Sequence, residues 1–240
     1  MRGVEGRAVA ADGEGMLATP ITGYLMWFVF AGVGIAAYIA RTRRWRAEEE
    51  SIESWAAAKG YQPSEPGPAS TPIRQAANGH AGPCFAVPVG GAEGELFAYT
   101  YTIGSGRDQR SVDTTLVQAD MAPGLPQFRV VPRHANDLPS GPWGDREMDL
   151  ESVEFHDDHR LLVDHDGDRE VLERVFDPET IVWFINLGAN APVVEYTGGT
   201  LVVAARQCCM TGAACDTLLG QAQYIAGRLQ ASGVEPAPSR

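Results

Sequence analysis

The feature that most constrains this chain is an apolar stretch near its N-terminus, residues 17–40. No Asp, Glu, Lys or Arg lies between Glu14 and Arg41. A helix needs about 20 apolar residues to cross the hydrocarbon core of a bilayer. Backbone groups in lipid must be hydrogen-bonded within the segment itself, which requires a helix. The stretch therefore predicts a transmembrane helix over residues 17–40, and the lipid bilayer is its expected partner.

The arginines around this stretch predict its orientation. Arg2 and Arg7 precede it, and a denser basic group follows it directly: Arg41, Arg43, Arg44 and Arg46. Basic residues beside a span stay on the cytoplasmic side. We therefore expect a single-pass protein of the cell membrane whose C-terminal domain is cytoplasmic; the reversed orientation would place that domain in the envelope. The long apolar run and the acidic N-terminal segment disfavour a cleaved signal peptide.

Small residues recur along the predicted span at Gly32, Ala36 and Ala40. A small residue in every fourth position lets two helices approach closely in a membrane. This stripe predicts a homodimer or a contact with another membrane protein. The alternative is that the stripe has no partner, since small residues are common in spans.

Composition divides the remaining chain into segments. Residues 46–59 are typical of a helix, in which Ile52, Trp55 and Ala56 form one apolar face and Gly60 follows the last turn. Prolines are frequent from residue 61 to 82, which predicts a linker. The full division is a disordered tail at 1–16, the transmembrane helix at 17–40, a juxtamembrane helix at 41–60, a Pro-rich linker at 61–82, a folded domain at 83–231 and a disordered tail at 232–240.

Short alternating runs with glycine-rich connectors dominate the folded domain. We expect strands at 83–89, 95–103, 111–121, 128–132 and 151–163, and a hairpin at 193–205 that turns at Gly198 and Gly199. Helices are expected at 169–176, 179–186 and 212–231. Because strands and helices do not alternate regularly, the pattern predicts an α+β fold with an antiparallel sheet and packed helices behind the N-terminal transmembrane helix.

The charge distribution bears on the partners of this domain. The formal net charge is −12, and residues 1–50 contain six acids and six arginines, so the whole excess lies on residues 51–240. Such a domain is repelled by phosphate backbones. We therefore expect no nucleic-acid binding.

Acidic residues are densest between positions 145 and 179, where 14 of them occur. Asp164, Asp166 and Asp168 surround a glycine, and His156 and His159 flank two further aspartates. The spacing differs from that of a calcium-binding EF-hand, and histidines three apart on a strand face opposite ways. A turn followed by a helix explains the pattern without a metal. We therefore predict no metal, cofactor or catalytic site; these five residues are the ones that a metal-dependent alternative would use.

Four cysteines are present, namely Cys84, Cys208, Cys209 and Cys215. A domain of this length does not need a disulfide framework. Buried, unpaired thiols in a reducing compartment are the simpler interpretation. The alternative is a redox or metal function for Cys208, Cys209 and Cys215, with Cys84 as a distant partner.

Several segments resemble a group of uncharacterised single-pass membrane proteins from high-GC actinobacteria: residues 55–61, 150–155, 159–163, 177–187 and 196–200. The resemblance implies a membrane protein and carries no activity or site residue with it. The sequence also contains no phosphate-binding loop, no Gly-x-Ser-x-Gly elbow and no His-Glu-x-x-His pair. We therefore expect a non-enzymatic, membrane-anchored interaction or assembly module. The alternative is a hydrolase or metal-dependent enzyme that uses the His/Asp-rich segment 156–168.

Overall fold

The computed structural model describes residues 19–76, 78–135, 138–139, 141, 143, 146–164, 169–205, 209 and 211–232; the side chains of 19–25 and 48 are excluded from this description. The chain divides into two compact units, Met1–Arg46 and Ala47–Arg240. Helix α1, Thr19–Lys59, begins in the first unit, and its last turns belong to the second.

The first unit contributes residues 19–46 of α1. Its large apolar side chains are exposed: Met26, Trp27, Phe28, Val29, Phe30, Val33, Ile35, Tyr38 and Ile39. Within the part of the chain that the structure describes, no helix is long and apolar enough to cross a membrane. The predicted span of residues 17–40 extends beyond that part, as do the predicted tails at 1–16 and 233–240.

The second unit is built on an eight-stranded sheet in the order β1-β2-β3-β4-β8-β7-β5-β6, with every neighbouring pair antiparallel. The strands are β1 Pro63–Ser64, β2 His80–Val89, β3 Ala92–Ile103, β4 Arg110–Asp120, β5 Phe128–Pro132, β6 His159–Val163, β7 Val193–Thr197 and β8 Thr200–Ala204. The predicted α+β class with an antiparallel sheet is confirmed. So is the hairpin at Gly198 and Gly199, which have φ values of 60° and 89°.

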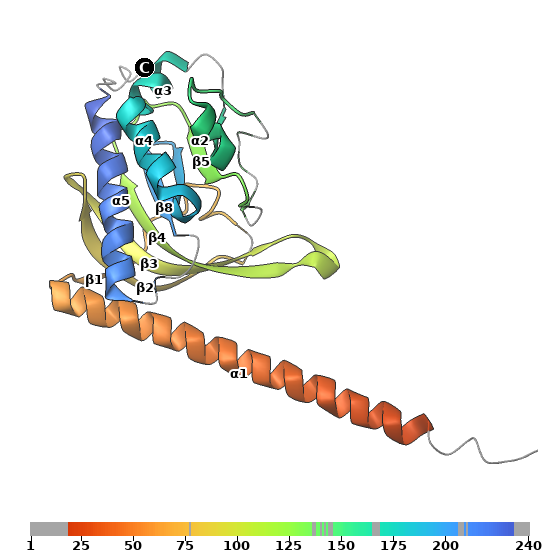
Figure 1. Ribbon diagram of the computed structural model, residues 1–240. Helices are drawn as coiled ribbons and strands as arrows, with labels where there is room; N and C mark the ends of the chain where they lie inside the picture. Colours follow the sequence, from red (N-terminus) through yellow and green to blue (C-terminus); the bar gives the residue numbers. More distant parts are fainter. Residues whose placement is uncertain are drawn as a thin grey trace, which may run out of the picture. The chain divides into compact units, whose positions relative to one another are not determined.

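Helices cover one face of this sheet (Figure 1). They are α2 Val153–Asp158, α3 Arg169–Val175, α4 Pro178–Leu187 and α5 Gly212–Ala231, with short 3-10 turns η1 at Gly106–Asp108 and η3 at Gly188–Asn190. Helix α5 contacts β2, β4 and β8, and Tyr224 of α5 stacks on Trp183 of α4 with ring centroids 4.6 Å apart. The side chains of Asp177 and Thr211 cap α4 and α5 by accepting hydrogen bonds from backbone amides.

The structure differs from the strand predicted over residues 151–163. Its first half is helix α2, which begins because the Ser152 hydroxyl accepts a hydrogen bond from the Phe155 amide at 3.2 Å. Only the second half, His159–Val163, forms a strand. The phenyl ring of Phe155 is fully buried, so this short helix contributes to the core.

The last turns of α1 belong to the same unit and present the predicted apolar face. Ile52, Trp55 and Ala56 are buried, and the Trp55 indole donates a hydrogen bond to Asp216 of α5 at 3.0 Å. Gly60, with φ of 75°, follows the helix as expected. These last turns of α1 are thereby fixed on the N-terminal end of α5.

The second face of the sheet is covered by irregular chain. A buried cluster on this face joins side chains of β3, β4, β7 and β8 to Ile73. Residues 71–74 are all buried, although the sequence predicts a linker at 61–82, and the same segment holds β1 and the first residues of β2. We call residues 65–76 the lead-in segment. Its packing explains why both faces of the sheet are apolar.

Candidate functional site

Beneath the lead-in segment, a row of polar side chains crosses the otherwise apolar sheet. Cross-strand pairing places Glu95 opposite Gln118, Gln118 opposite Val202, Val202 opposite Glu195, and Glu195 opposite Arg129. Directly opposed residues of antiparallel strands lie on the same face. The row therefore runs from β3 to β5 under one continuous stretch of irregular chain.

Three members of this row hold the lead-in segment by hydrogen bonds. The Gly67 amide donates to Glu95 Oε2 at 2.7 Å, and the Ile73 amide donates to Glu195 Oε2 at 3.2 Å. Between them, Arg74 Nε donates to Gln118 Oε1 at 3.1 Å. A chain without regular secondary structure needs such partners for its backbone groups when it is buried. The polar row thus acts first as the anchor of the lead-in segment.

Arg129 and Glu195 form an ion pair inside the domain, where their side chains are 5% and 0% exposed. The guanidinium of Arg129 lies over the ring of Trp143, 4.4 Å from its centroid, and Nη1 donates to the Pro139 carbonyl at 2.8 Å. Burial raises the pKa of the Glu195 carboxyl above its usual value, and the charge of Arg129 opposes that shift. Each charge of the pair therefore offsets the cost of burying the other.

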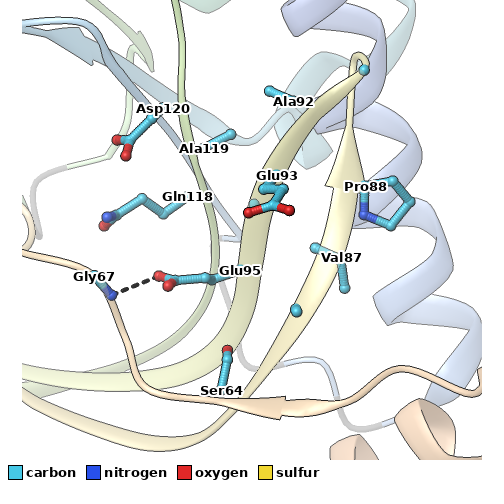
Figure 2. Close-up of a pocket in the computed structure, with 13 residues that line it drawn as sticks. Ser64, Gly67, Val87, Pro88, Ala92, Glu93, Glu95, Gln118, Ala119 and Asp120 are labelled. Carbon is cyan, nitrogen blue, oxygen red and sulfur yellow. Dashed lines mark hydrogen bonds between the residues drawn. The ribbon is translucent and has the colours of Figure 1, made fainter.

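At the Glu95 end, the row opens into a cavity of about 640 Å³, which we call the acidic cavity. It is formed by the lead-in segment, the tip of the β2–β3 hairpin and the end of β4 (Figure 2). Its lining residues are Ser64, Gly67, Ala86, Val87, Pro88, Gly91, Ala92, Glu93, Gly94, Glu95, Gln118, Ala119 and Asp120.

Three carboxylates line the acidic cavity, and none of its lining residues is basic. Glu93 and Glu95 share a face because they are two apart on β3, and Asp120 ends the neighbouring β4 (Figure 2). Asp120 Oδ1 accepts a hydrogen bond from the Thr200 hydroxyl at 3.3 Å. Ser64, the hydroxyl of the lining, is hydrogen-bonded to Cys84 Sγ at 3.3 Å. The carboxylates of the cavity offer hydrogen-bond acceptors for a cationic group. Ser64 is hydrogen-bonded to a thiol and not to a base that could activate it as a nucleophile.

The structure separates the two histidines of the acidic stretch. His156 Nε2 accepts a hydrogen bond from the Leu150 amide at 2.8 Å. His159 is fully buried between the rings of Phe155 and Phe184, at centroid distances of 5.2 and 5.6 Å. Burial lowers the pKa of His159, which favours the neutral imidazole. The two imidazoles thus lie in different local environments.

Of Asp164, Asp166 and Asp168, the structure describes only Asp164. The backbone carbonyl of Asp164 accepts a hydrogen bond from Arg146 at 2.5 Å, while Asp166 and Asp168 lie outside the described residues. Among the residues that are described, no three His, Cys, Asp or Glu side chains are grouped so that they could hold a metal ion. The metal-dependent alternative receives no geometric support from this part of the chain.

Two further candidates can be placed. The stripe residues Gly32, Ala36 and Ala40 are exposed on α1, and a Cβ added at Gly32 would meet nothing within 4 Å. Cys84 is buried, and burial raises the pKa of its thiol to about 11. Cys209, which precedes α5, and Cys215, which lies within α5, are buried as well, and Cys208 lies outside the described residues.

No family model and no curated protein matches this sequence. One solved structure resembles the fold, the crystal structure of the mycobacterial trehalose monomycolate transport factor A, TtfA. The TM-score is 0.57, the sequence identity is 12%, and the match covers 81% of this chain and 99% of that chain. At this identity the likeness concerns the fold.

Proposed function

We propose that this chain is a membrane-tethered, non-enzymatic module that serves as an accessory factor to a membrane transport machinery. The observation that carries the proposal is the fold likeness to TtfA, described as a trehalose monomycolate transport factor, because it extends over 99% of that chain. From that description we take the class of role alone. The carboxylates of the acidic cavity and the pairing of its serine with a thiol are consistent with binding rather than catalysis.

The proposed tether is residues 17–40 of α1. Exposed apolar side chains such as Trp27, Phe30 and Ile35 support it, because water solvates such a surface poorly. The arginines that follow it would hold the second unit on the cytoplasmic side. The stripe of Gly32, Ala36 and Ala40 would be the contact for a second copy or for the transport protein itself.

The proposed contact with the transport protein is the acidic cavity. Cytoplasmic loops of membrane proteins carry an excess of Lys and Arg. A strongly acidic domain held at the same membrane surface attracts such loops over about one Debye length. The carboxylates of Glu93 and Asp120 would receive an ammonium or guanidinium group, while Glu95 keeps its bond to the lead-in segment.

The enzymatic alternative would need the segment 156–168 to assemble a reactive centre. His156 is hydrogen-bonded to a backbone amide, and His159 is enclosed by aromatic rings. Neither arrangement resembles a base that is poised beside a nucleophile or a metal. We therefore prefer the binding role.

The tether is tested by placing charge in it. Full-length chain with Val33→Glu and Ile35→Arg should move from the membrane to the soluble fraction, because charged residues in the bilayer centre cost about 2.5–3.5 kcal/mol each. Val182→Glu, at a similarly exposed position of α4, is the matched control and should leave the distribution unchanged. If the unmodified chain, the Val33→Glu with Ile35→Arg variant and the Val182→Glu variant divide equally between membrane and soluble fractions, the tether is refuted.

The contact is tested by cross-linking in native membranes. The full chain should capture a multi-span transport protein. The pair Glu93→Gln with Asp120→Asn should reduce that capture about two- to thirtyfold, because both carboxylates are exposed and an exposed ion pair is worth about 0.2–1 kcal/mol. The pair Glu154→Gln with Glu170→Gln removes the same charge from exposed helix positions and should have no effect. Capture that is insensitive to the cavity variants, or of soluble proteins alone, would overturn the proposal.

A further inference from the structure

The hairpin of β3 and β4 projects beyond the other strands as a two-stranded arm (Figure 1). Strand β2 pairs with β3 as far as Thr100, and β8 pairs with β4 from Leu116 onward. Between these two points the residues of β3 and β4 pair with each other. We call residues 101–113 the arm and residues 104–111, which are all exposed, its tip. The tip is therefore the part of this hairpin that another molecule meets first.

The tip of the arm presents a basic side chain on a closed turn. The Asp108 amide donates a hydrogen bond to the Ser105 carbonyl at 3.3 Å across η1. Gly104 has φ of 81°, and a Cβ there would lie 2.5 Å from the Asp108 carbonyl oxygen, so the turn requires glycine. Arg107 is the middle residue of η1 and is exposed. The tip contains two arginines and one acid, so it is net positive in a strongly negative domain.

The acidic cavity is complementary to this tip in charge. Glu93 and Asp120 are exposed carboxylates of its lining, and no lining residue is basic. Three glycines of the lining, Gly67, Gly91 and Gly94, place no side chain in it. A guanidinium pairs with carboxylates through parallel N–H···O hydrogen bonds and keeps its charge at all ordinary pH values. The cavity, at about 640 Å³, therefore has both the room and the acceptors for an arginine side chain.

The arm cannot reach the acidic cavity of its own chain. Ile103 follows Glu95 by eight residues on β3, and a strand rises about 3.3 Å per residue, so these positions lie about 26 Å apart. The cavity and the tip are thus at opposite ends of the same strands. A second copy that lies alongside with its strands reversed brings its tip to this cavity and receives the first tip in its own. Such an arrangement closes as a two-fold dimer, because both copies use the same surfaces.

We propose that the arm of one copy occupies the acidic cavity of a second copy, so that the chain forms a reciprocal homodimer in which Arg107 binds Glu93 and Asp120. The basic loop of the transport protein competes with the arm for the same carboxylates, and this competition alone rests on the proposed function. The dimer itself needs only the purified chain. Capture of a transport protein in native membranes is a separate measurement, so the dimer and the proposed function can fail independently.

The first test cross-links amines to carboxylates with a water-soluble carbodiimide. Equal amounts of unlabelled and isotope-labelled full chain are mixed in detergent, so that mass spectrometry separates links between copies from links within one copy. Lys59 is the single lysine of the sequence, and its Nζ lies 2.9 Å from Asp216 Oδ1. A link between these two residues within one copy is the internal standard. The variant Arg107→Lys then adds one reactive amine at the tip of the arm.

In Arg107→Lys, position 107 should become linked to Glu93 or Asp120 of the other copy. Arg174→Lys places an amine at an exposed position of α3 and is the matched control, which should give no link to the cavity. The proposal is overturned if the Lys59 standard forms while position 107 is linked to neither carboxylate, or if the control gives the same links. Contact through the stripe of α1 does not produce this product, because the stripe contains no amine or carboxylate.

The second test exchanges the charges and measures self-association by sedimentation in detergent. Arg107→Glu and Glu93→Arg should each weaken association at least about fivefold, because every substitution turns two attractive contacts into repulsive ones. An equimolar mixture of the two variants should recover association, since both contacts of the mixed dimer are again between opposite charges. Arg174→Glu should behave as the unmodified chain. Association that is insensitive to position 107, or a mixture that does not recover, contradicts the reciprocal contact.

Discussion

Replacing Glu195 with alanine removes the carboxylate that compensates Arg129 inside the domain. The two side chains are 0% and 5% exposed, so the guanidinium stays buried when its partner is lost. Breaking a buried ion pair on one side costs about 3–5 kcal/mol. The Ile73 amide also loses its acceptor, which adds about 1–3 kcal/mol. We expect a total of about 4–8 kcal/mol, which is comparable with the whole stability of an ordinary domain.

Two further variants separate these contributions. Glu195→Gln retains an acceptor for Ile73 and should lose about 3–5 kcal/mol, the part that belongs to the charge. The double variant Glu195→Leu with Arg129→Met has no buried charge and leaves the Ile73 amide as the main loss, about 1–3 kcal/mol. The double variant should therefore be more stable than Glu195→Leu alone.

The assay is urea unfolding of the full chain in detergent, followed by near-ultraviolet circular dichroism. This signal includes Trp143, which stacks on the Arg129 guanidinium. If the dependence of the free energy of unfolding on urea concentration is the same for all variants, their free energies can be compared directly. The double-mutant cycle then gives the interaction energy between positions 129 and 195. If the double variant is less stable than both single variants and the losses simply add, the two charges do not compensate each other and the reasoning fails.

Three other outcomes follow from the structure. Gly90→Ala should cost about 2–4 kcal/mol in urea unfolding, because φ is 57° and the new Cβ would lie 2.6 Å from Ala226 Cβ, whereas Gly91→Ala, with open space, should cost about 1 kcal/mol. The lowered pKa of His159 means that the unfolded chain binds the proton more readily, so stability should fall as pH decreases below 6.5; His159→Leu should remove this part of the pH dependence in thermal melts. Asp177→Ala removes the cap of α4 and should cost about 1 kcal/mol, while Asp177→Asn should keep most of it; equal losses would exclude capping as the cause.

The elements that were predictable from sequence are those with a local signal. The hairpin at 193–204 has alternating apolar residues and two glycines at its turn, and α5 has an apolar stripe at helical spacing. Helix α2 was missed because one and a half turns are too short for periodicity. Its signal was Ser152, whose hydroxyl could be recognised as a cap.

The lead-in segment and the acidic cavity depend on contacts that are distant in sequence. Prolines made residues 61–82 look like a linker, but Glu95 and Glu195 bind its amides across 28 and 122 positions. The alternation of Glu93 and Glu95 was visible in the sequence, whereas the proximity of Asp120 follows from the register of β3 and β4. A pattern of residue types specifies faces of strands, and it does not specify which strands become neighbours.

The position of β7 and β8 in the sheet has a consequence for how the protein is made. These strands pair with β4 and β5 and so join β1–β4 to β5 and β6. During translation they leave the ribosome after all the others, when β4 and β5 still present unpaired edges. Such edges are prone to pair with other chains. A nascent chain that stops before residue 193 would therefore contain two half-sheets, each with an unpaired edge strand that can pair with another chain. The two half-sheets become one domain only when β7 and β8 have been synthesised.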